Sequence, residues 1–256
     1  MLIATRSGEI TFPSTIAAEP TSWAPDSERL AVYEYDPTNS PSGPAVLDLR
    51  DGRRYEIGLF SSSGLTWSPK GDLVAYGHDG YVYVERPNAT KRHRLTRGAF
   101  TDWSGDGTLL AFVRRRGKTW SSGYVMRPNG RNVRRMPGRP KDWVWSPHGR
   151  TYAFGRELYD FATRRRWRVL PRAVEVSKPI WSANGRRLAY PGVDKLFVVD
   201  RSGRRGHLIR WPKSARVSDP SWSPDGRRLA FMTEDGLHLV DADGRHRRYV
   251  PLHVCD

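Results

Sequence analysis

Histidine and cysteine are the residue types whose spacing would indicate catalysis or metal binding, and here their spacing indicates neither. No two of the seven histidines stand at a spacing typical of zinc ligands. The single cysteine, Cys255, cannot form an internal disulfide and is a weak candidate for a nucleophile. The sequence also lacks a G-x-S-x-G elbow, an H-E-x-x-H motif and a glycine-rich phosphate loop. We therefore predict no metal, no cofactor and no catalytic residue from these motifs.

One histidine does lie beside an acid. The stretch "YGHDG" places His78 next to Asp79 in a segment that we expect to be a loop. A histidine and a carboxylate at the mouth of a cavity can bind a ligand or move a proton. A solvated loop pair is the commoner reading of such a stretch. We keep His78 and Asp79 as candidate channel-mouth residues, which only groups converging from elsewhere in the fold would make an active site.

Arginine carries the clearest sign of a binding partner. The net charge is +16, with 36 Arg against 7 Lys. Residues 86–172 hold 22 basic and 5 acidic residues, whereas 1–85 hold 6 and 12 and 173–256 hold 15 and 10. Coding bias alone would spread arginine evenly, so this concentration is informative. A concentrated basic region is typical of a surface that meets nucleic acid or another polyanion.

A phrase of ten residues, repeated six times, predicts the elements that position these arginines. It reads "WSPDGRRLAF" in its last copy, and its tryptophans stand 44, 36, 42, 36 and 41 residues apart. The tryptophans that open the copies are Trp23, Trp67, Trp103, Trp145, Trp181 and Trp222. A period of about 40 residues indicates a repeat architecture.

One unit reads as four short strands. In the last unit we predict strands at 219–223, 227–232, 236–241 and 246–252, with turns at "PDG" and "ADGR". Four consecutive antiparallel strands in about 40 residues make one blade of a β-propeller. We therefore expect an all-β chain, residues 1–256, forming a single β-propeller domain of six four-stranded blades. A hairpin within residues 1–15 is expected at the ring closure, and the alternative is seven blades with one incomplete.

The repeated phrase has a packing role. Tryptophan is bulky enough to fill the space between neighbouring blades. Eight residues after every tryptophan stands an alanine, which indicates a point where blades approach closely. The phrase resembles the repeat of TolB-type, WD-like propellers from Trp23 to the C-terminus. That resemblance implies the fold but not one function, because the superfamily includes scaffolds, periplasmic partner-binding proteins, peptidase-associated domains and polysaccharide lyases.

Propeller topology then places part of the charge on one face. Loops between the second and third strands share a face with the connections between blades. The residues that we expect on this basic loop face, on blades three and four, are Arg97, Arg114, Arg115, Arg116, Lys118, Trp120, Arg139, Lys141, Arg156 and Arg172. Basic groups with an aromatic among them suit a polyanion. A solvated basic face, or a dock for an acidic protein, is the alternative.

These observations favour a binding or interaction scaffold over an enzyme. The expected partner is an acidic protein or a nucleic acid, and the alternative is a lyase or hydrolase acting on a polyanionic carbohydrate at the channel mouth. Arg6 and Glu9 interrupt the apolar core that a signal peptide needs, and no apolar run is long enough to span a membrane. We therefore expect a cytoplasmic monomer with no membrane partner.

Overall fold

The structure is a computed structural model in which the described residues form β-strands joined by tight turns. It describes residues 3–4, 10–11, 17–35, 41–58, 63–116, 119–171, 178–210, 217–234 and 236–251. The one helical segment among them is a 3-10 turn, η1 (Pro140–Asp142). The chain divides into two compact units, Met1–Met136 and Pro137–Asp256.

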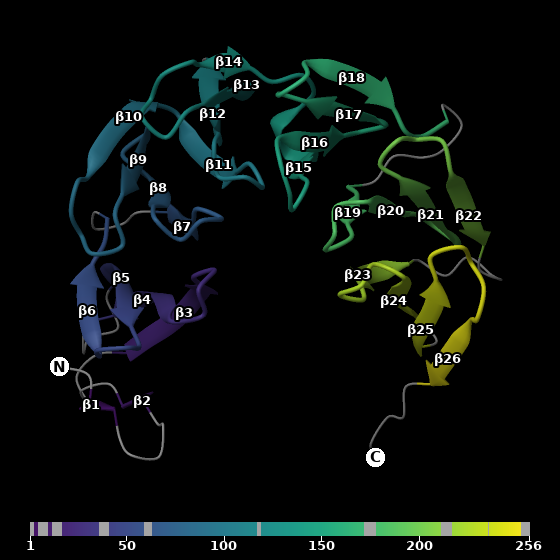
Figure 1. The fold of residues 1–256 in the computed structure, drawn as a ribbon, viewed down its shortest axis with the longest axis horizontal. Coiled ribbons are helices and arrows are strands. Elements are labelled where there is room, and N and C mark those ends of the chain that lie inside the picture. Colours follow the sequence, from purple (N-terminus) through teal and green to yellow (C-terminus); the bar gives the residue numbers. More distant parts are fainter. Residues whose placement is uncertain are drawn as a thin grey trace. The chain divides into compact units, whose positions relative to one another are not determined.

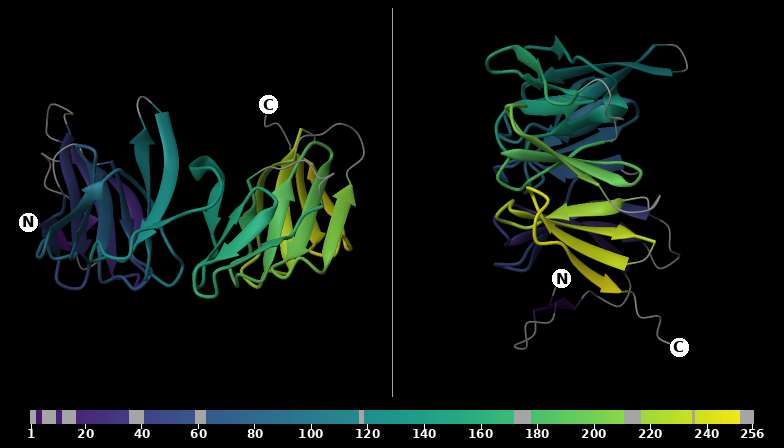
Figure 2. Two further views of the ribbon diagram at one scale, coloured as in Figure 1. Left: turned by 90° about the horizontal axis from the view of Figure 1, so that it is seen from above. Right: turned by 90° about the vertical axis from the view of Figure 1, so that its right-hand side faces the viewer.

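Unit one holds three antiparallel sheets of four strands, each with its strands in chain order (Figure 1). The first blade consists of β3 (Ala17–Trp23), β4 (Arg29–Tyr35), β5 (Pro41–Asp48) and β6 (Arg53–Glu56). The second consists of β7 (Ser63–Trp67), β8 (Val74–His78), β9 (Tyr81–Glu85) and β10 (His93–Arg97). The third consists of β11 (Ala99–Trp103), β12 (Leu110–Arg116), β13 (Thr119–Met126) and β14 (Arg134–Arg135). Figure 2 shows the β12–β13 hairpin, coloured teal, extending beyond its neighbours in this unit.

Unit two repeats the arrangement. The fourth blade consists of β15 (Trp143–Trp145), β16 (Thr151–Phe154), β17 (Glu157–Asp160) and β18 (Arg165–Arg168). The fifth consists of β19 (Ile180–Trp181), β20 (Arg187–Pro191), β21 (Lys195–Asp200) and β22 (Gly206–Arg210). The sixth consists of β23 (Ser218–Trp222), β24 (Arg228–Thr233), β25 (Gly236–Asp241) and β26 (Arg248–Pro251). The predicted strands of this blade lie within two residues of the observed bounds.

The prediction of an all-β propeller with six four-stranded blades is confirmed. The predicted N-terminal hairpin is also present, as β1 (Ile3–Ala4) paired with β2 (Ile10–Thr11) in a separate two-stranded sheet. Its turn at Ser7-Gly8 lies outside the described residues. A role for this hairpin at a ring closure stays a prediction, as does the expectation of one domain.

The turn of the repeated phrase is held by its serine and aspartate. In the third blade, the Ser104 hydroxyl donates to the Asp106 carboxylate at 2.8 Å, and the backbone N–H of Thr108 donates to the same carboxylate at 3.0 Å. The N–H of Gly107 closes the turn on the Ser104 carbonyl at 2.8 Å. Hydrogen bonds of this kind are the reason Asp and Ser favour turns. The aspartates of the phrase are therefore turn residues.

The tryptophans join each blade to the one before it. In unit one, the Trp103 indole N–H donates to the Thr66 carbonyl at 3.2 Å, and the Trp67 indole donates to the Ser22 carbonyl at 3.3 Å. In unit two, Trp181 and Trp222 donate in the same way to Val144 and Ile180, each at 3.1 Å. Every acceptor is the residue immediately before the tryptophan of the preceding blade.

Trp23 and Trp145, each in the first blade of its unit, have different surroundings. Trp23 is 58% exposed. Trp145 is half-buried and packs within its own blade, with its ring centroid 5.4 Å from that of Tyr152 and 6.0 Å from that of Phe161. The interblade role predicted for the tryptophans is thus seen at Trp67, Trp103, Trp181 and Trp222 among the described contacts.

The small residue of the phrase lies where the blades meet. Ala75 is fully buried in one cluster with Trp103 and Phe112 of the next blade. Ala31 holds the equivalent place against Trp67, as does Ala153 against Trp181. Each of these alanines is fully buried in the cluster of the facing indole, so a larger side chain would crowd that packing.

Enlarging this alanine should therefore push two blades apart. We expect Ala75→Leu to lower the free energy of unfolding by about 1–3 kcal/mol through overpacking. The matched control is Ala162→Leu, at an exposed turn position in the fourth blade, where the change should stay within about 0.5 kcal/mol. Urea denaturation of both variants checks this, and equal stability of the two would contradict the packing role.

Candidate polyanion-binding site

The turn between β8 and β9 begins the candidate site on the second blade. Asp79 and Gly80 both have positive φ, 46° and 73°. Two such residues form the tight hairpin turn whose twist matches the flanking strands, which explains the Asp-Gly pair. His78 and Tyr81 lie directly opposite each other on either side of this turn. The His78 Nε2 atom is 3.1 Å from the exposed Asp79 carboxylate.

A β-bulge brings two arginines to one tyrosine. In β10, Arg94 lies opposite Tyr83 and Arg97 lies opposite Tyr81, with the register shifting between them. In a regular strand, residues three apart point to opposite faces, but the extra residue of a bulge returns the second to the face of the first. Arg94 and Arg97 therefore both reach Tyr81. Their guanidinium carbons lie 4.7 and 5.5 Å from the centre of its ring.

The contact between Arg97 and Tyr81 is also a hydrogen bond. The Arg97 Nε–H donates to the Tyr81 hydroxyl at 2.9 Å. This bond, with smaller contributions from the charges of Arg97 and Arg94, lowers the pKa of the Tyr81 phenol, although slight desolvation opposes the effect. Arg94 and Arg97 are exposed, and neither forms an ion pair with an acid among the described residues. Two positive charges thus meet at one ring without a facing carboxylate.

Arg114 extends this positive region across β10 to the third blade. Its Nη2 donates to the Thr96 hydroxyl at 3.2 Å, and its guanidinium carbon lies 4.8 Å from the Tyr124 ring centre. Thr96 pairs with Val82 and so points to the opposite face of the sheet from Arg97. The arginines therefore flank the edge strand β10 on both sides. We call Tyr81, Arg94, Arg97 and Arg114 the Tyr81 site.

Sequence reasoning missed Gly98, which connects the two blades of this site. Its N–H donates to the Gly80 carbonyl at 2.8 Å, so the interblade connection and the β8–β9 turn do share one face. Its φ is +145°, and a Cβ there would lie 2.6 Å from the Val113 carbonyl oxygen. The residue must be glycine for both reasons. The glycine in "RGAF", directly after a strand, was the feature of the sequence that could have identified it.

The structure places the other predicted residues of the third blade in strands. Arg114, Arg115 and Arg116 were expected in a loop, but they belong to β12, because Arg116 still pairs with Thr119 across the hairpin. Trp120 pairs with Arg115 in β13. Lys118 lies outside the described residues, and so does Arg172. The prediction of a loop over 114–120 is therefore wrong at 114–116 and 119–120, where β12 and β13 are still paired.

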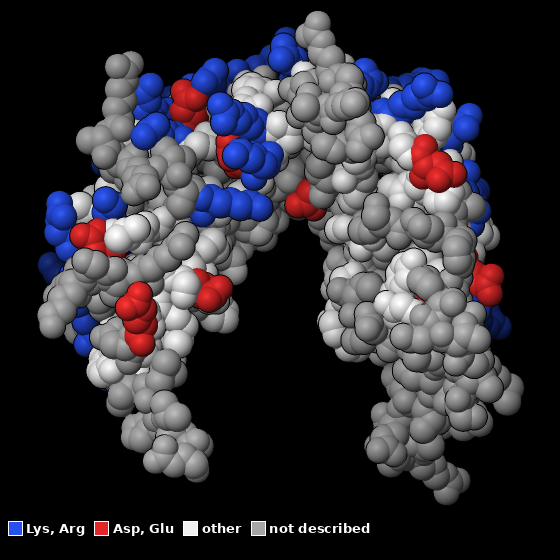
Figure 3. Space-filling model, turned by 180° about the vertical axis from the view of Figure 1, so that it is seen from behind, with Lys and Arg blue, Asp and Glu red and all other residues white. Residues whose placement is uncertain are grey.

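Unit two contributes three of the predicted residues. Arg139 and Lys141 are exposed, before and within η1. Arg156 is half-buried in the turn between β16 and β17, and its carbonyl accepts the N–H of Val169 from the following connection at 2.9 Å. Figure 3 shows Lys and Arg side chains gathered mainly on the outer parts of the face drawn, with a few Asp and Glu side chains among them.

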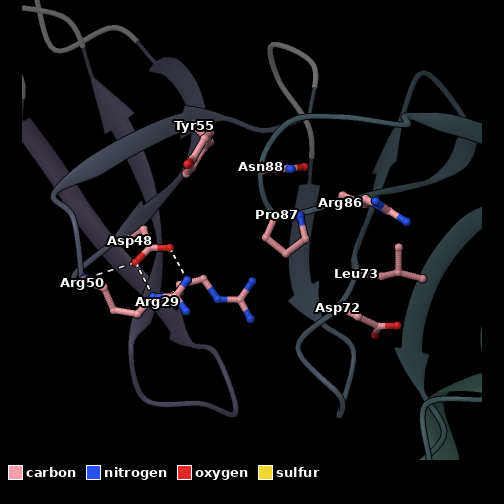
Figure 4. A pocket seen from close by; sticks show the side chains of 9 residues that line it. All are labelled: Arg29, Asp48, Arg50, Tyr55, Asp72, Leu73, Arg86, Pro87 and Asn88. Carbon is pink, nitrogen blue, oxygen red and sulfur yellow. Dashed lines mark hydrogen bonds and ion pairs between the residues drawn. The ribbon is translucent and has the colours of Figure 1, made fainter.

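A cleft of about 630 Å³ lies at the other end of the strands, between the first and second blades (Figure 4). Its first-blade side carries Arg29, Asp48, Arg50 and Tyr55, and its second-blade side carries Asp72, Leu73, Arg86, Pro87 and Asn88. Sequence reasoning did not single out this cleft. Its residues belong to the turns of the phrase and of the outer hairpins, which were assigned structural roles.

The charges of this cleft are largely paired. Arg50 Nη2 donates to the Asp48 carboxylate at 2.5 Å and its Nη1 lies 3.4 Å from Glu28. Arg29 pairs with Asp26 at 2.6 Å and donates to the Gly71 carbonyl at 2.7 Å. These bonds hold the blades and turns together and leave little charge for an outside anion. We therefore place the candidate binding function at the Tyr81 site and a structural function here.

Within the described ranges, no three His, Cys, Asp or Glu residues come together in a way that could hold a metal ion. No helix in that part of the chain is long and apolar enough to cross a membrane.

Comparison with known proteins shows the fold. No family model matches the chain, and no curated protein matches its sequence. An oligogalacturonate lyase in complex with manganese superposes with a TM-score of 0.64 at 14% identity, covering 93% of this chain and 78% of that one. The dipeptidyl peptidase 4 of Porphyromonas gingivalis gives 0.66 at 12% identity, covering 91% of this chain and 46% of that one. A putative TolB of Agrobacterium tumefaciens gives 0.49 at 19% identity, covering 79% and 86%. The shared feature is the β-propeller, and enzymes are among the proteins that share it.

The Asp48–Arg50 pair predicts an acid-sensitive contribution to stability. The side-chain hydrogen bond from Arg50 lowers the pKa of the buried Asp48 carboxyl, although burial opposes it. The stabilisation is therefore present above the ordinary carboxyl pKa of about 4 and is lost as pH falls through the lowered value. We expect Asp48→Asn to be less stable than the parent at neutral pH, with the difference closing in acid. Asp51→Asn, an exposed carboxylate in the same turn, is the control, and a pH-independent difference in urea midpoints would contradict the assignment.

The Tyr81 site predicts one tyrosine that ionises early. Because Arg97 stabilises the phenolate, Tyr81 should titrate below the ordinary tyrosine pKa of about 10. Subtracting the ultraviolet titration curve of Tyr81→Phe from that of the parent should isolate the ionisation of Tyr81. Arg97→Gln should move it upward, whereas Arg127→Gln, at an exposed turn of the third blade, should leave it in place. A curve unchanged by Arg97→Gln would show that the hydrogen bond does not form.

Proposed function

We propose that this chain is a non-enzymatic binding module for a polyanion, and that the Tyr81 site is where the polyanion binds. The observation that carries the proposal is the meeting of Arg94 and Arg97 over one tyrosine ring. Both guanidinium groups are held in place and face no described carboxylate. A phosphate or carboxylate supplied by a partner would complete the charge balance.

Arginine suits this role better than lysine would. Its planar guanidinium stacks on an aromatic ring and still presents N–H donors at its edge to an anion. The ring also reduces the entropy that the side chain loses on binding, because the guanidinium is already ordered. Other arginines of the unit are committed to acids, such as Arg54 to the buried Glu34 and Arg92 to the buried Glu85.

The arrangement favours an extended partner over a compact one. Arg97 lies on one side of β10 and Arg114 on the other, so a single small anion does not satisfy both. A chain of anionic groups that crosses the edge strand does. Nucleic acid is the partner that we place first, since its phosphates repeat at short intervals. An acidic protein segment is the alternative within the same proposal.

The second candidate function is a propeller enzyme that acts on a polyanionic carbohydrate. The observation that favours it is the pairing of His78 with Asp79 in the same row of residues as Tyr81 and Arg97. Two structural neighbours are oligogalacturonate lyases, one of them from Vibrio parahaemolyticus. Their identity to this chain, 14% and 10%, extends to the fold only.

The binding proposal predicts a salt-dependent affinity that depends on two arginines. We expect the parent to bind a short duplex DNA, with the double variant Arg94→Gln/Arg97→Gln binding more weakly and with a salt slope shallower by about 0.9 for each lost phosphate contact. The control Arg127→Gln/Arg131→Gln removes the same charge from exposed turn positions of the same unit. Fluorescence anisotropy across a salt series measures both.

The comparison also separates the alternatives. An equal loss of DNA affinity in both double variants would mean that DNA is attracted by the overall positive charge, and would contradict a specific site. If Arg94→Gln/Arg97→Gln weakens the binding of poly-glutamate but not that of DNA, the partner is an acidic protein. If the parent releases an unsaturated product from polygalacturonate and His78→Ala does not, the chain is an enzyme and the binding proposal is wrong.

A further inference from the structure

A second cleft, in unit two, differs from the others in the charge of its wall. It lies between the fourth and fifth blades, has a volume of about 360 Å³ and is lined by Arg165, Trp167, Arg201, Ser202 and Arg204. The clefts between blades one and two and between blades five and six are each lined by two aspartates as well as arginines. Among the described residues, the wall of the fourth–fifth cleft carries three guanidinium groups and no carboxylate.

Bonds behind the cleft hold its wall in place. The Trp167 indole N–H donates to the Arg201 carbonyl at 2.9 Å, which ties the fourth blade to the β21–β22 turn. Arg201 Nη2 donates to the hydroxyl of the fully buried Thr151 and lies 3.5 Å from the Asp160 carboxylate. The Ser202 hydroxyl and the Arg204 N–H both bond the Asp200 carboxylate, at 2.7 and 3.1 Å, which sets the turn.

Asp160, the acid that lies opposite Arg165 and near Arg201, is already occupied. Asp160 accepts the Thr151 hydroxyl at 2.6 Å and the backbone N–H groups of Ala162 and Thr163, each at 2.9 Å. Arg165 lies opposite Asp160 in the sheet, yet its guanidinium is 5.7 Å from the centre of the Trp167 ring. No ion pair joins Arg165 or Arg204 to an acid among the described residues.

From this geometry we propose that the fourth–fifth cleft binds a phosphomonoester carried on a small organic body. Arginine forks match phosphate oxygens in pairs, and Arg165 and Arg204 together neutralise a dianion, whereas Arg201 is already paired with Asp160 and helps to hold the wall. The Trp167 face beside them offers a surface for the ring or sugar that carries the phosphate. A volume of about 360 Å³ falls within the range of small-ligand pockets and is too small for a folded partner.

The phosphate could belong to a free mononucleotide or to the 5′ end of a nucleic acid, and both present the same group. This site is in unit two and shares no residue with the Tyr81 site. The test of this proposal is therefore independent of the test of the proposed function.

The test is a titration of the full chain with adenosine monophosphate, inorganic phosphate and adenosine, followed by calorimetry and by tryptophan fluorescence. We expect adenosine monophosphate to bind, phosphate to compete, and adenosine to bind at least about tenfold more weakly because it lacks the charge-assisted bonds. A 5′-phosphorylated oligonucleotide that competes, where its unphosphorylated form does not, would identify the chain-end source.

Matched variants locate the site. Arg165→Gln/Arg204→Gln changes two exposed side chains that support no other described contact than the Trp167 ring, and should weaken adenosine monophosphate about tenfold or more. Arg186→Gln/Arg205→Gln makes the same charge change in the neighbouring cleft and should have little effect, as should Arg94→Gln/Arg97→Gln. Trp167→Phe should remove the fluorescence response. Failure of the parent to bind, or equal weakening by the two unit-two double variants, overturns the proposal.

Discussion

Each unit depends on one repeated interaction, the hydrogen bond from a tryptophan indole to the carbonyl of the preceding blade. The acceptor lies in the first strand of that blade, which is an edge of its sheet and has no strand on its other side. The indole therefore satisfies a carbonyl that sheet pairing leaves open and shields it with its rings. Burial of the ring and satisfaction of the edge are achieved by one side chain, which explains why the phrase begins with tryptophan and not with another aromatic residue.

The same stacking sets the geometry of the candidate site. Once Trp103 is bound to Thr66 and Ala75 is pressed against it, the third blade has a single position relative to the second. That position brings Arg114 to Thr96 and leaves Gly98 with room for nothing larger than hydrogen. The binding residues lie at blade ends, and the apolar junctions beneath them determine their spacing. Functional variation can thus be confined to turns and edge strands while the phrase stays constant.

Much of the fold could be predicted from the sequence because it is encoded locally. The period of the tryptophans, the Asp-Gly turns and the alternation of apolar residues each report a nearest-neighbour contact. The site was less accessible. Arg94 was not among the residues expected on the basic loop face, because nothing in "HRLTR" shows that Leu95 lies in a bulge. Two further features also depend on which hairpins meet, and charge counts along the chain contain no information on that. These are the paired state of Arg29 and Arg50, and the lack of an ion-pair partner for Arg165 and Arg204 among the described residues.

The bulge in β10 has a consequence for how this surface can change. Alternate residues of a strand point to opposite faces of the sheet. A substitution at Arg97 therefore changes the amount of charge on its face but does not move the charge to the other face. If Leu95 were paired in the ladder instead of bulged, Arg94 and Arg97 would be three regular positions apart, and the second guanidinium would turn to the face that Thr96 now occupies. Loss of the bulge would thus move a positive charge through the sheet with no change in composition. The pairing of one residue is here a second variable, besides the identity of the charged residues, through which the electrostatic pattern of a blade can evolve.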